Sequence, residues 1–295
     1  MRILIAGSNT YIAGCLIPFL LQNGHEVICL ARDKKHFMSQ KKHEGAQVIQ
    51  ADLLRNAAIE PFPVDIDVAL YLGGRLTQTT GFAGLEALSA QNFMNALNQT
   101  DCRQVITTSN LNNPKIQVAD EILAGGRAAF TGLQLSMVIG EGSLAMELFD
   151  ALTHHTTTVI TSAWAAAQIQ PVYINDVLSY LKNCLLNAAT FGKRLSVCGP
   201  EVFSFKQMLS DYCATFKPGK KNILVLPALG TRLASYIANF LSPLSYPEAQ
   251  NLLANLHYNS VCADTRISDI GPQKYVSFKQ SLKLIHDQNK LSIPA

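Results

Sequence analysis

The chain begins with Met1-Arg-Ile-Leu-Ile-Ala-Gly-Ser-Asn-Thr-Tyr-Ile-Ala-Gly14, and this stretch decides its fold. Residues 3–6 form an apolar run with the length and β-branched character of a buried strand, and an apolar-periodic helix begins soon after Gly7. A strand, a glycine turn and a helix start are the parts of a dinucleotide site, because amides at a helix N-terminus receive the pyrophosphate. The Gly-x-x-Gly-x-x-Gly spacing is reduced here to Gly7, Thr10 and Ala13, so the loop alone is weak evidence.

Strands and helices alternate along the first half of the chain. The apolar patterns predict strands at residues 27–31, 46–51, 64–72, 104–108 and 132–139. Helical spacing is found at residues 85–97 and 115–123. Strands that alternate with helices at this spacing pair in parallel through right-handed crossovers. The sequence therefore predicts a Rossmann-type, doubly wound α/β fold with a parallel sheet.

Past residue 142 the alternation is less regular and the pattern is mostly helical. We expect a nucleotide-binding domain at residues 1–142, with return segments near 166–199. A smaller, mostly helical annex on the substrate side is expected at residues 143–295. In the annex, Ser204–Gln207 and Ser277–Gln280 both fit the Ser-x-x-Gln capping box that opens a helix.

Composition excludes several classes of protein. Apolar residues make up 48% of the 295 residues and charged residues 15%, which is enough for a sizeable core and argues against disorder. The net charge of +3, from 24 basic and 21 acidic residues, is too even to favour nucleic acid or an anionic membrane surface. The first residues lack a signal-peptide pattern, and no window of about twenty residues is apolar enough for stable membrane insertion. We therefore expect a cytoplasmic protein that binds no nucleic acid and does not insert stably into a membrane.

Cysteine and histidine usage gives no sign of a metal site. The seven cysteines are scattered and form no Cys-x-x-Cys pair, and most lie in apolar runs. Reduced core thiols, as in a cytosolic protein, are the expectation. His154 and His155 are adjacent, so they point apart on a helix or a strand, and no cysteine or carboxylate lies at ligand spacing from them.

Segments along nearly the whole chain carry a family resemblance. Besides the opening loop, they are Gly24-His-Glu-Val27, Leu30-Ala-Arg32, Gln50-Ala-Asp-Leu53, Gly132-Leu-Gln-Leu-Ser-Met-Val-Ile-Gly140, Ile169-Gln-Pro-Val-Tyr-Ile-Asn-Asp-Val177 and Val197-Cys-Gly-Pro-Glu201. In this order and spacing they resemble the extended and atypical branch of the short-chain dehydrogenase/reductase superfamily. The likeness is greatest to its NmrA-like, NAD-dependent-epimerase-like and complex-I-accessory-like groups.

The resemblance implies a set of cofactor-binding residues. They are Gly7, Asn9, Thr10, Tyr11, Ile12, Arg32, Asp52, Leu53, Gly73 and Gly74. The amides around Thr10, Tyr11 and Ile12 would face the pyrophosphate. Arg32 ends the second strand, where an NAD enzyme more often has an acidic residue for the ribose hydroxyls. A guanidinium at this place pairs with a 2′-phosphate or stacks on the adenine, so NADP is favoured, with NAD as the alternative.

Several of these positions have a structural alternative. Arg32 and the residues up to Lys35 also fit a solvated loop. Asp52 either borders the adenine or caps a helix at the end of the third strand. Gly73 and Gly74 either let the backbone approach the adenosine ribose or form a turn.

The catalytic pattern of the family is incomplete. An active member has a serine after the fifth strand and a Tyr-x-x-x-Lys in the next helix, where the tyrosine moves the proton and the lysine lowers its pKa. Ser109 stands at the expected place, and Lys115 is the lysine that follows it, but no tyrosine lies between Tyr71 and Tyr173. Two tyrosines are candidates to replace the missing acid: Tyr11 on the glycine loop, and Tyr173 on the extended segment after Pro171, which the resemblance places on the substrate side. The alternatives are a strand-end hydroxyl for Ser109, a surface role for Lys115 and packing for Tyr173.

Three functions fit these residues. The first is an NADP-binding oxidoreductase or epimerase-like enzyme acting on a small carbonyl or nucleotide-linked substrate. The second is a cofactor-binding redox sensor or assembly subunit without turnover, which the absent Tyr-x-x-x-Lys favours. The third is a scaffold that has lost the nucleotide, because Thr10 and Ala13 add a Cβ where glycines are expected. The substrate is unidentified, and the resemblance implies a homodimer or a protein partner.

Overall fold

The structure is a computed structural model that describes residues 1–40, 43–55, 59–72, 83–111, 117–153, 158–161, 163–217, 219, 222–225, 259–262 and 270–292. The chain forms two compact units. The first unit consists of residues 1–134, 178–196 and 266–271, and the second of residues 135–177, 197–265 and 272–295.

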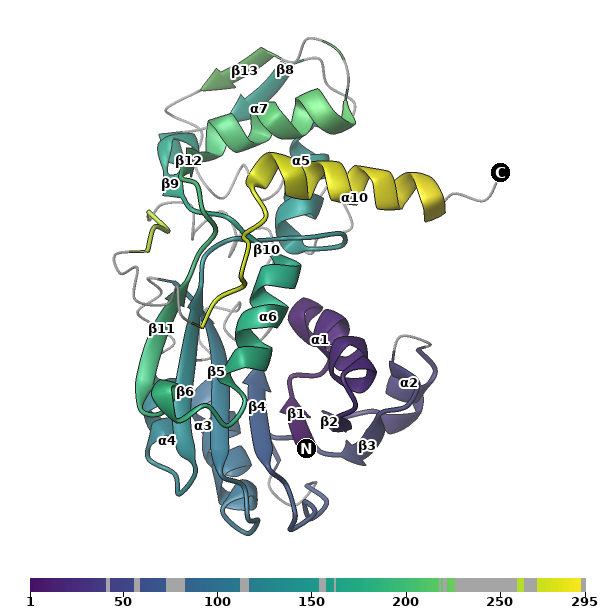
Figure 1. The fold of residues 1–295 in the computed structure, drawn as a ribbon, viewed down its shortest axis with the longest axis vertical. Helices are drawn as coiled ribbons and strands as arrows, with labels where there is room; N and C mark the ends of the chain where they lie inside the picture. Colours follow the sequence, from purple (N-terminus) through teal and green to yellow (C-terminus); the bar gives the residue numbers. More distant parts are fainter. Residues whose placement is uncertain are drawn as a thin grey trace. The chain divides into compact units, whose positions relative to one another are not determined.

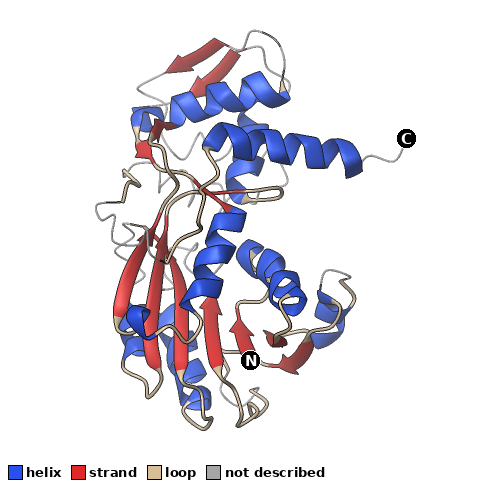
Figure 2. Ribbon diagram, in the orientation of Figure 1, coloured by secondary structure: helices blue, strands red, loops and turns tan. Residues whose placement is uncertain are grey.

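A seven-stranded sheet is the centre of the first unit (Figures 1 and 2). Its strands are β1 (Arg2–Ala6), β2 (Glu26–Ala31), β3 (Gln47–Gln50), β4 (Val68–Leu72), β5 (Gln104–Asn110), β6 (Ala129–Leu135) and β11 (Lys193–Val197). They lie in the order β11-β6-β5-β4-β1-β2-β3. The pairs β1–β2, β2–β3, β1–β4 and β4–β5 are parallel. The predicted Rossmann-type, doubly wound fold is thereby confirmed.

Strand β1 is buried on both faces. Ile3, Leu4 and Ile5 have no exposed surface, as expected for a central parallel strand with helices on either side. Leu4 packs into the cluster formed with α3 (Ala83–Leu97) and α4 (Gln117–Ala124). Ile3 and Ile5 point to the opposite face because side chains alternate along a strand. On that face α1 (Tyr11–Gln22) covers the sheet (Figure 1).

A buried glutamine holds the segment that leads from α6 (Ile174–Cys184) to β11. Gln104, the first residue of β5, has no exposed surface, and its Nε2 donates to the Cys184 carbonyl and to Thr131 Oγ1, each at 3.0 Å. Its Oε1 accepts from the Leu186 amide at 2.5 Å. Leu186 has a φ of 52°, a left-handed conformation that leucine rarely adopts. Gln104 therefore fixes an otherwise unfavourable turn against the sheet.

The second unit combines three two-stranded sheets with helices (Figure 1). The pairs are β7 (Val138–Ile139) with β10 (Val172–Tyr173), β9 (Gln168–Ile169) with β12 (Phe203–Ser204), and β8 (Thr158–Thr161) with β13 (Asn222–Val225). The helices are α5 (Leu144–Thr153), α7 (Phe205–Phe216) and α10 (Phe278–Ser292), with a 3-10 turn at Ala163–Ala166. Rings of Phe149, Tyr212 and Phe216 pack together across α5 and α7. None of the described helices in either unit is long and apolar enough to cross a membrane.

The structure confirms some local predictions and shifts the bounds of others. Both predicted capping boxes, Ser204–Gln207 and Ser277–Gln280, are present. In each, the serine hydroxyl accepts from the backbone amide of the glutamine, and the glutamine side-chain oxygen accepts from the backbone amide of the serine. The strand expected from residue 64 begins at Val68, because residues 64 and 65 form a turn. A single strand was expected at residues 132–139, but the structure has two strands there, β6 and β7. Between them the Ser136 amide donates to the Val197 carbonyl.

Two cysteines of the second unit form a disulfide. Cys198 and Cys262 are joined with their Cα atoms 6.2 Å apart and 64 positions apart in the sequence. The expectation of reduced thiols is therefore wrong for this pair. No spacing motif in the sequence indicated the bond, because two segments far apart in the chain must first be brought together by the fold. The other five cysteines, which all lie in the described part of the chain, form no disulfide there.

Candidate functional site

The carboxyl ends of the parallel strands form the candidate cofactor site of the first unit. The chain runs from β1 to β2 and β3 on one side, and then crosses to β4 and β5 on the other, so the strand order reverses between β1 and β4. In open α/β sheets, nucleotides bind at the carboxyl ends of the strands where the order reverses. The register places Ala31 beside Gln50 and Leu72 beside Thr108, which defines this edge of the sheet.

Gly7 lies at the reversal point and can only be glycine. Its φ is +78°, a conformation that side-chain-bearing residues rarely adopt. A Cβ at this position would lie 2.0 Å from the Leu72 carbonyl oxygen at the end of β4. The backbone of the loop therefore passes directly against the neighbouring strand end. This is the close approach that the glycine loop of a dinucleotide site needs, so the residues present fit a pyrophosphate.

Thr10 and Ala13 occupy the other two glycine positions without disturbing the loop. Thr10 is the N-cap of α1, and its hydroxyl accepts from the Ala13 amide at 3.3 Å. The Thr10 amide donates to the Gly7 carbonyl at 3.0 Å and closes the turn. Ala13 has no exposed surface, so its methyl group is accommodated where the helix meets the sheet. The first turn of α1 contains no acidic side chain, which leaves the positive end of the helix dipole for an anion.

Ser8 is part of the site but was missed in the sequence. Its side chain is almost fully buried and donates from Oγ to the Leu30 carbonyl at 2.5 Å. This bond ties the loop to the end of β2. A serine after the turn glycine is too common in loops to signal such a role. The neighbouring predicted residues are accessible: Asn9 is exposed, and Tyr11 and Ile12 are half-buried.

Arg32 lies at the end of β2 and is exposed. Its carbonyl accepts from Gln50 Nε2 at 3.3 Å, which fixes the backbone. Within the described part of the chain, no carboxylate forms an ion pair with its guanidinium. Asp33 caps the short helix α2 (Lys34–Met38) by accepting from the His36 amide at 2.9 Å. The charged stretch is thus a helix start rather than an irregular loop, and Arg32 directs its charge to the solvent beside the site.

Asp52 and Leu53 follow β3 at the same edge of the sheet. The Asp52 carboxylate accepts from the Leu54 amide at 3.1 Å and lies 3.8 Å from the Arg55 guanidinium. These residues form a turn, so the alternative of a helix cap at Asp52 is wrong. The Leu53 carbonyl accepts from Asn92 Nδ2 on α3 at 2.9 Å, a contact that no sequence pattern indicated. This hydrogen bond therefore connects the turn after β3 to α3.

The proposed catalytic residues are placed only in part. Ser109 lies near the end of β5, one residue beyond Thr108, and its side chain is 8% exposed. Tyr173 belongs to β10 of the second unit and is 5% exposed. Lys115 lies outside the described residues, as do Gly73 and Gly74. Gly7, Arg32, Asp52 and Ser109 therefore come together at one edge of one sheet, whereas Tyr173 belongs to another unit.

Two carboxyl groups on α3 and α4 are buried, and one of them contacts β5. Asp120 on α4 accepts from Thr107 Oγ1 at 3.1 Å, and Thr107 precedes Ser109 by two residues on the same face of β5. Glu86 in the first turn of α3 is 8% exposed, and Asp120 is 4% exposed. Burial, with the charge of Asp120, raises the pKa of Glu86 to about 7. Burial also raises the pKa of Asp120, although the Thr107 bond opposes this.

Glu86→Gln is expected to remove a pH dependence of stability. The ordinary pKa of 4.5 rises to about 7 on folding, so the folded state retains a proton that the unfolded chain releases. The resulting stability is complete below the ordinary pKa and is lost as the pH rises through the folded pKa. At about pH 8 the variant should therefore be more stable than the wild type by about 2 kcal/mol, and below about pH 4.5 the two should converge. Urea unfolding followed by circular dichroism across this range measures the difference.

The matched control is Glu121→Gln, which changes an exposed carboxylate on α4. Its stability should follow the wild-type pH curve throughout. A Glu86→Gln curve parallel to the wild type would contradict the raised pKa of Glu86.

Comparison with known proteins agrees with this geometry. Residues 7–125 match a family model described as NAD(P)H-binding. A comparison with curated protein sequences finds no match. Among solved structures, UDP-glucose 4-epimerase from Thermotoga maritima is 12% identical with a TM-score of 0.71, and the alignment covers 99% of each chain. A nucleoside-diphosphate-sugar epimerase from Staphylococcus aureus is 13% identical with a TM-score of 0.71, over 96% of this chain and 100% of that one.

A short-chain dehydrogenase/reductase superfamily protein from Agrobacterium tumefaciens, solved with bound NAD, shares the fold as well. It is 11% identical with a TM-score of 0.59, over 87% of this chain and 97% of that chain. At such identities the likeness establishes the fold. The fold that the resemblance to the short-chain dehydrogenase/reductase superfamily implied is therefore confirmed, and residues 7–125 match an NAD(P)H-binding model.

Proposed function

We propose that this chain binds NADP(H) and transfers hydride between the cofactor and a small carbonyl or nucleotide-linked substrate. The observation that carries the proposal is Gly7 at the strand-order reversal, where a Cβ would meet the Leu72 carbonyl at 2.0 Å. The capped first turn of α1 beside it offers amides and a helix dipole to the pyrophosphate. The NAD(P)H-binding match covers this loop.

The preference for NADP over NAD rests on Arg32. Its exposed guanidinium follows β2, where a ribose-binding carboxylate would favour NAD. Lys34 and Lys35, both exposed, add positive charge close by. A 2′-phosphate suits such a group because arginine can pair with it through two hydrogen bonds.

Three residues are proposed for the chemistry. Ser109, at the end of β5, would bind the substrate oxygen, and Lys115 would hold the nicotinamide ribose. Tyr173 would replace the tyrosine of the missing Tyr-x-x-x-Lys as proton donor. The nucleotide-linked substrate class is supported by the UDP-glucose 4-epimerase of the same fold, which was solved with UDP-glucose.

A titration with NADPH and NADH tests the proposal. We expect NADPH to bind at least about ten times more tightly than NADH, a difference of about 1.4 kcal/mol. Arg32→Glu should remove this preference, because it replaces the phosphate partner with a like charge and offers a carboxylate to the ribose of NADH. Lys193→Glu, the same charge change at an exposed position of the far edge strand β11, should leave both affinities unchanged. Cofactor fluorescence gives the affinities, and a panel of carbonyl compounds and nucleotide sugars then reports turnover.

The outcomes separate the parts of the proposal. Equal affinities for the two cofactors, unaltered by Arg32→Glu, would remove the role of Arg32 but keep the nucleotide site. Absence of binding by either cofactor would contradict the function itself. Tight binding without turnover on any member of the panel would contradict the oxidoreductase and leave a cofactor-binding protein.

A further inference from the structure

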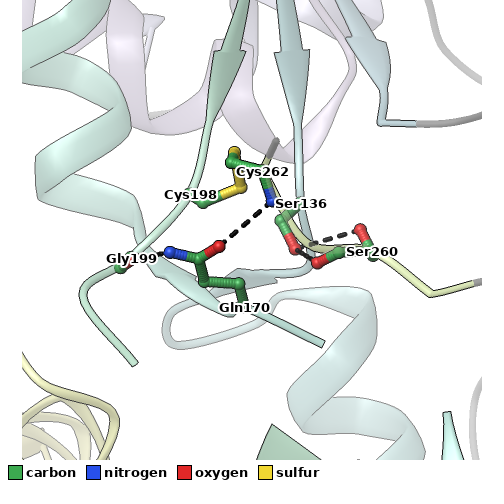
Figure 3. Close-up of a disulfide and its surroundings, with 6 residues drawn as sticks. All are labelled: Ser136, Gln170, Cys198, Gly199, Ser260 and Cys262. Atoms are coloured by element: carbon green, nitrogen blue, oxygen red, sulfur yellow. Dashed lines mark hydrogen bonds between the residues drawn. A yellow bond between two sulfur atoms is a disulfide. The ribbon is translucent and has the colours of Figure 1, made fainter. Parts of the chain in front are cut away.

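The disulfide of the second unit joins two segments that meet at one side chain. Cys198 follows β11 directly, and Cys262 ends the described segment 259–262 (Figure 3). Gln170 lies between them: its Nε2 donates to the Gly199 carbonyl at 2.7 Å, and its Oε1 accepts from the Cys262 amide at 3.1 Å. The two cysteine-bearing segments are therefore linked twice, once covalently and once through a single side-chain amide.

The segment 259–262 adds to β9 like a short strand. The Ser260 amide donates to the Gln168 carbonyl at 2.8 Å, and the Gln170 amide donates to the Ser260 carbonyl at 2.9 Å. Ser136 Oγ also donates to the Ser260 carbonyl at 2.9 Å and lies 3.0 Å from Ser260 Oγ (Figure 3). A few local hydrogen bonds of this kind contribute only modestly each. Among the described residues, segment 259–262 is attached to its neighbours by these hydrogen bonds, by the bond from the Gln168 amide to Asn259 Oδ1 at 3.0 Å, by the Gln170 bond to the Cys262 amide and by the disulfide.

The two cysteines of the disulfide differ in the described contacts around them. A Cβ at Gly199 would lie 2.0 Å from the Pro171 carbonyl oxygen, so the residue after Cys198 is packed directly against the segment that leads into β10. Cys198 is 7% exposed, whereas Cys262 is half-buried. Cys262 is therefore the more exposed residue of the pair. Reduction would leave hydrogen bonds as the described attachments of segment 259–262, whereas Gly199 would remain packed against Pro171.

Three of the five remaining thiols are poor competitors for redox chemistry. Cys29 and Cys184 are buried, and burial raises the pKa of each thiol to about 12. Cys102 is half-buried, and burial raises its pKa to about 11. Thiolates are the reactive form, so these groups react slowly with oxidants and disulfides. The Cys198–Cys262 pair, whose Cys262 is half-buried, is therefore more accessible to redox chemistry than Cys29 and Cys184.

We infer that Cys198 and Cys262 form a reversible thiol–disulfide switch that controls the attachment of segment 259–262 to Gln170 and Ser136. In the forward step, a thiolate of a small dithiol attacks Cys262 Sγ, the S–S bond breaks, and Cys198 leaves as a thiolate that takes a proton from water. The second thiolate of the dithiol then closes its own disulfide and releases Cys262, which is protonated in turn. Two electrons pass from the dithiol to the protein, and a small-molecule disulfide reverses the reaction.

Reduction is also expected to loosen the segment Gln170–Tyr173. When Cys262 moves away, the Gln170 side chain loses one of its two hydrogen-bond partners. Gln170 immediately precedes Pro171, and Tyr173 lies in β10. The inference concerns the second unit alone and does not require that the cofactor binds. Its failure and the failure of the proposed function are therefore separate results.

Hydrogen exchange of the full-length protein, measured by mass spectrometry with and without dithiothreitol, tests the switch. In the oxidised protein, differential alkylation should find Cys198 and Cys262 blocked and the other cysteines free. After reduction, amides of residues 168–173 and 259–262 should exchange at least about tenfold faster, since a cross-link that closes a long loop has been removed. Exchange in β1 and α7 should not change, and reoxidation with oxidised glutathione should restore the original pattern.

Two variants and a control complete the test. Cys198→Ser and Cys262→Ser should each show the faster exchange whatever the redox state, and Cys102→Ser should respond as the wild type does. Free thiols at both positions after treatment with oxidised glutathione would overturn the inference. So would unchanged exchange on reduction, or a loss of protection that extends through α7 and α10. The wild-type measurement decides the matter even where a serine variant fails to fold.

Discussion

Gly7→Ala is expected to lower the free energy of unfolding of the first unit by about 3 kcal/mol or more and to abolish NAD(P)H binding. Two effects add at this position. The φ of +78° is unfavourable for any residue with a Cβ, and the new methyl carbon would lie 2.0 Å from the Leu72 carbonyl oxygen. Leu72 cannot move freely, because it ends β4, which is paired on both sides with β1 and β5. The loop must shift, and the amides of the first turn of α1 shift with it.

Gly24→Ala is the matched control for the backbone effect. Gly24 follows the other end of α1 with a φ of +75°, but nothing lies within 4 Å of a Cβ built there. This variant should lose only about 1 kcal/mol, the ordinary penalty of a left-handed residue with a side chain, and should bind NAD(P)H normally. The difference between the two variants isolates the contact with Leu72. Urea unfolding and cofactor titration measure the two effects, and equal losses in both variants would refute the close approach at Gly7.

The fold was predictable because its signals are local. The apolar run at residues 3–6, Gly7 and the helical periodicity that follows are enough to place β1 and α1. The same alternation repeats through the first half, so the parallel sheet follows from crossover rules. The predicted start of β4 was wrong, because residues 64 and 65 form a turn before the strand begins. At Asp67, the carboxylate accepts from the Arg2 amide at 2.9 Å.

Of the candidate site, only the residues that follow a predicted strand could be located from the sequence. Gly7, Arg32, Asp52 and Ser109 each follow a strand that the sequence located, and parallel strands carry them to one edge. Ser8 could not be found this way, because its hydrogen bond to the Leu30 carbonyl depends on the register between β1 and β2. The disulfide between Cys198 and Cys262 is a contact across 64 positions, and it has no local signal at all. Long-range pairs of this kind come from the packed structure alone.

Gln104→Leu is expected to destabilise the first unit by about 3 kcal/mol. Leucine has nearly the volume of glutamine, so the loss is in hydrogen bonding rather than in packing. The substitution leaves the Leu186 amide and the Cys184 carbonyl without the fully buried side chain that now satisfies both. Leu186 already has a strained φ of 52°, and its turn is retained against this strain by the Gln104 bond. Chemical denaturation of the variant and the wild type measures the change.

Gln91→Leu is the matched control. It makes the same substitution at an exposed position, so it separates the loss of the buried Gln104 hydrogen bonds from any effect of replacing a glutamine by leucine. Gln91 is exposed on α3, and its Nε2 donates to Asn95 Oδ1 at 3.0 Å, a bond that water replaces readily. Its loss should change stability by less than about 0.5 kcal/mol. Hydrogen exchange adds a local measurement, since the Leu186 amide should be protected in the wild type and in Gln91→Leu but not in Gln104→Leu. If Gln104→Leu were as mild as the control, the turn at Leu186 would be held by the chain around it. The strained leucine would then need another explanation than the buried amide.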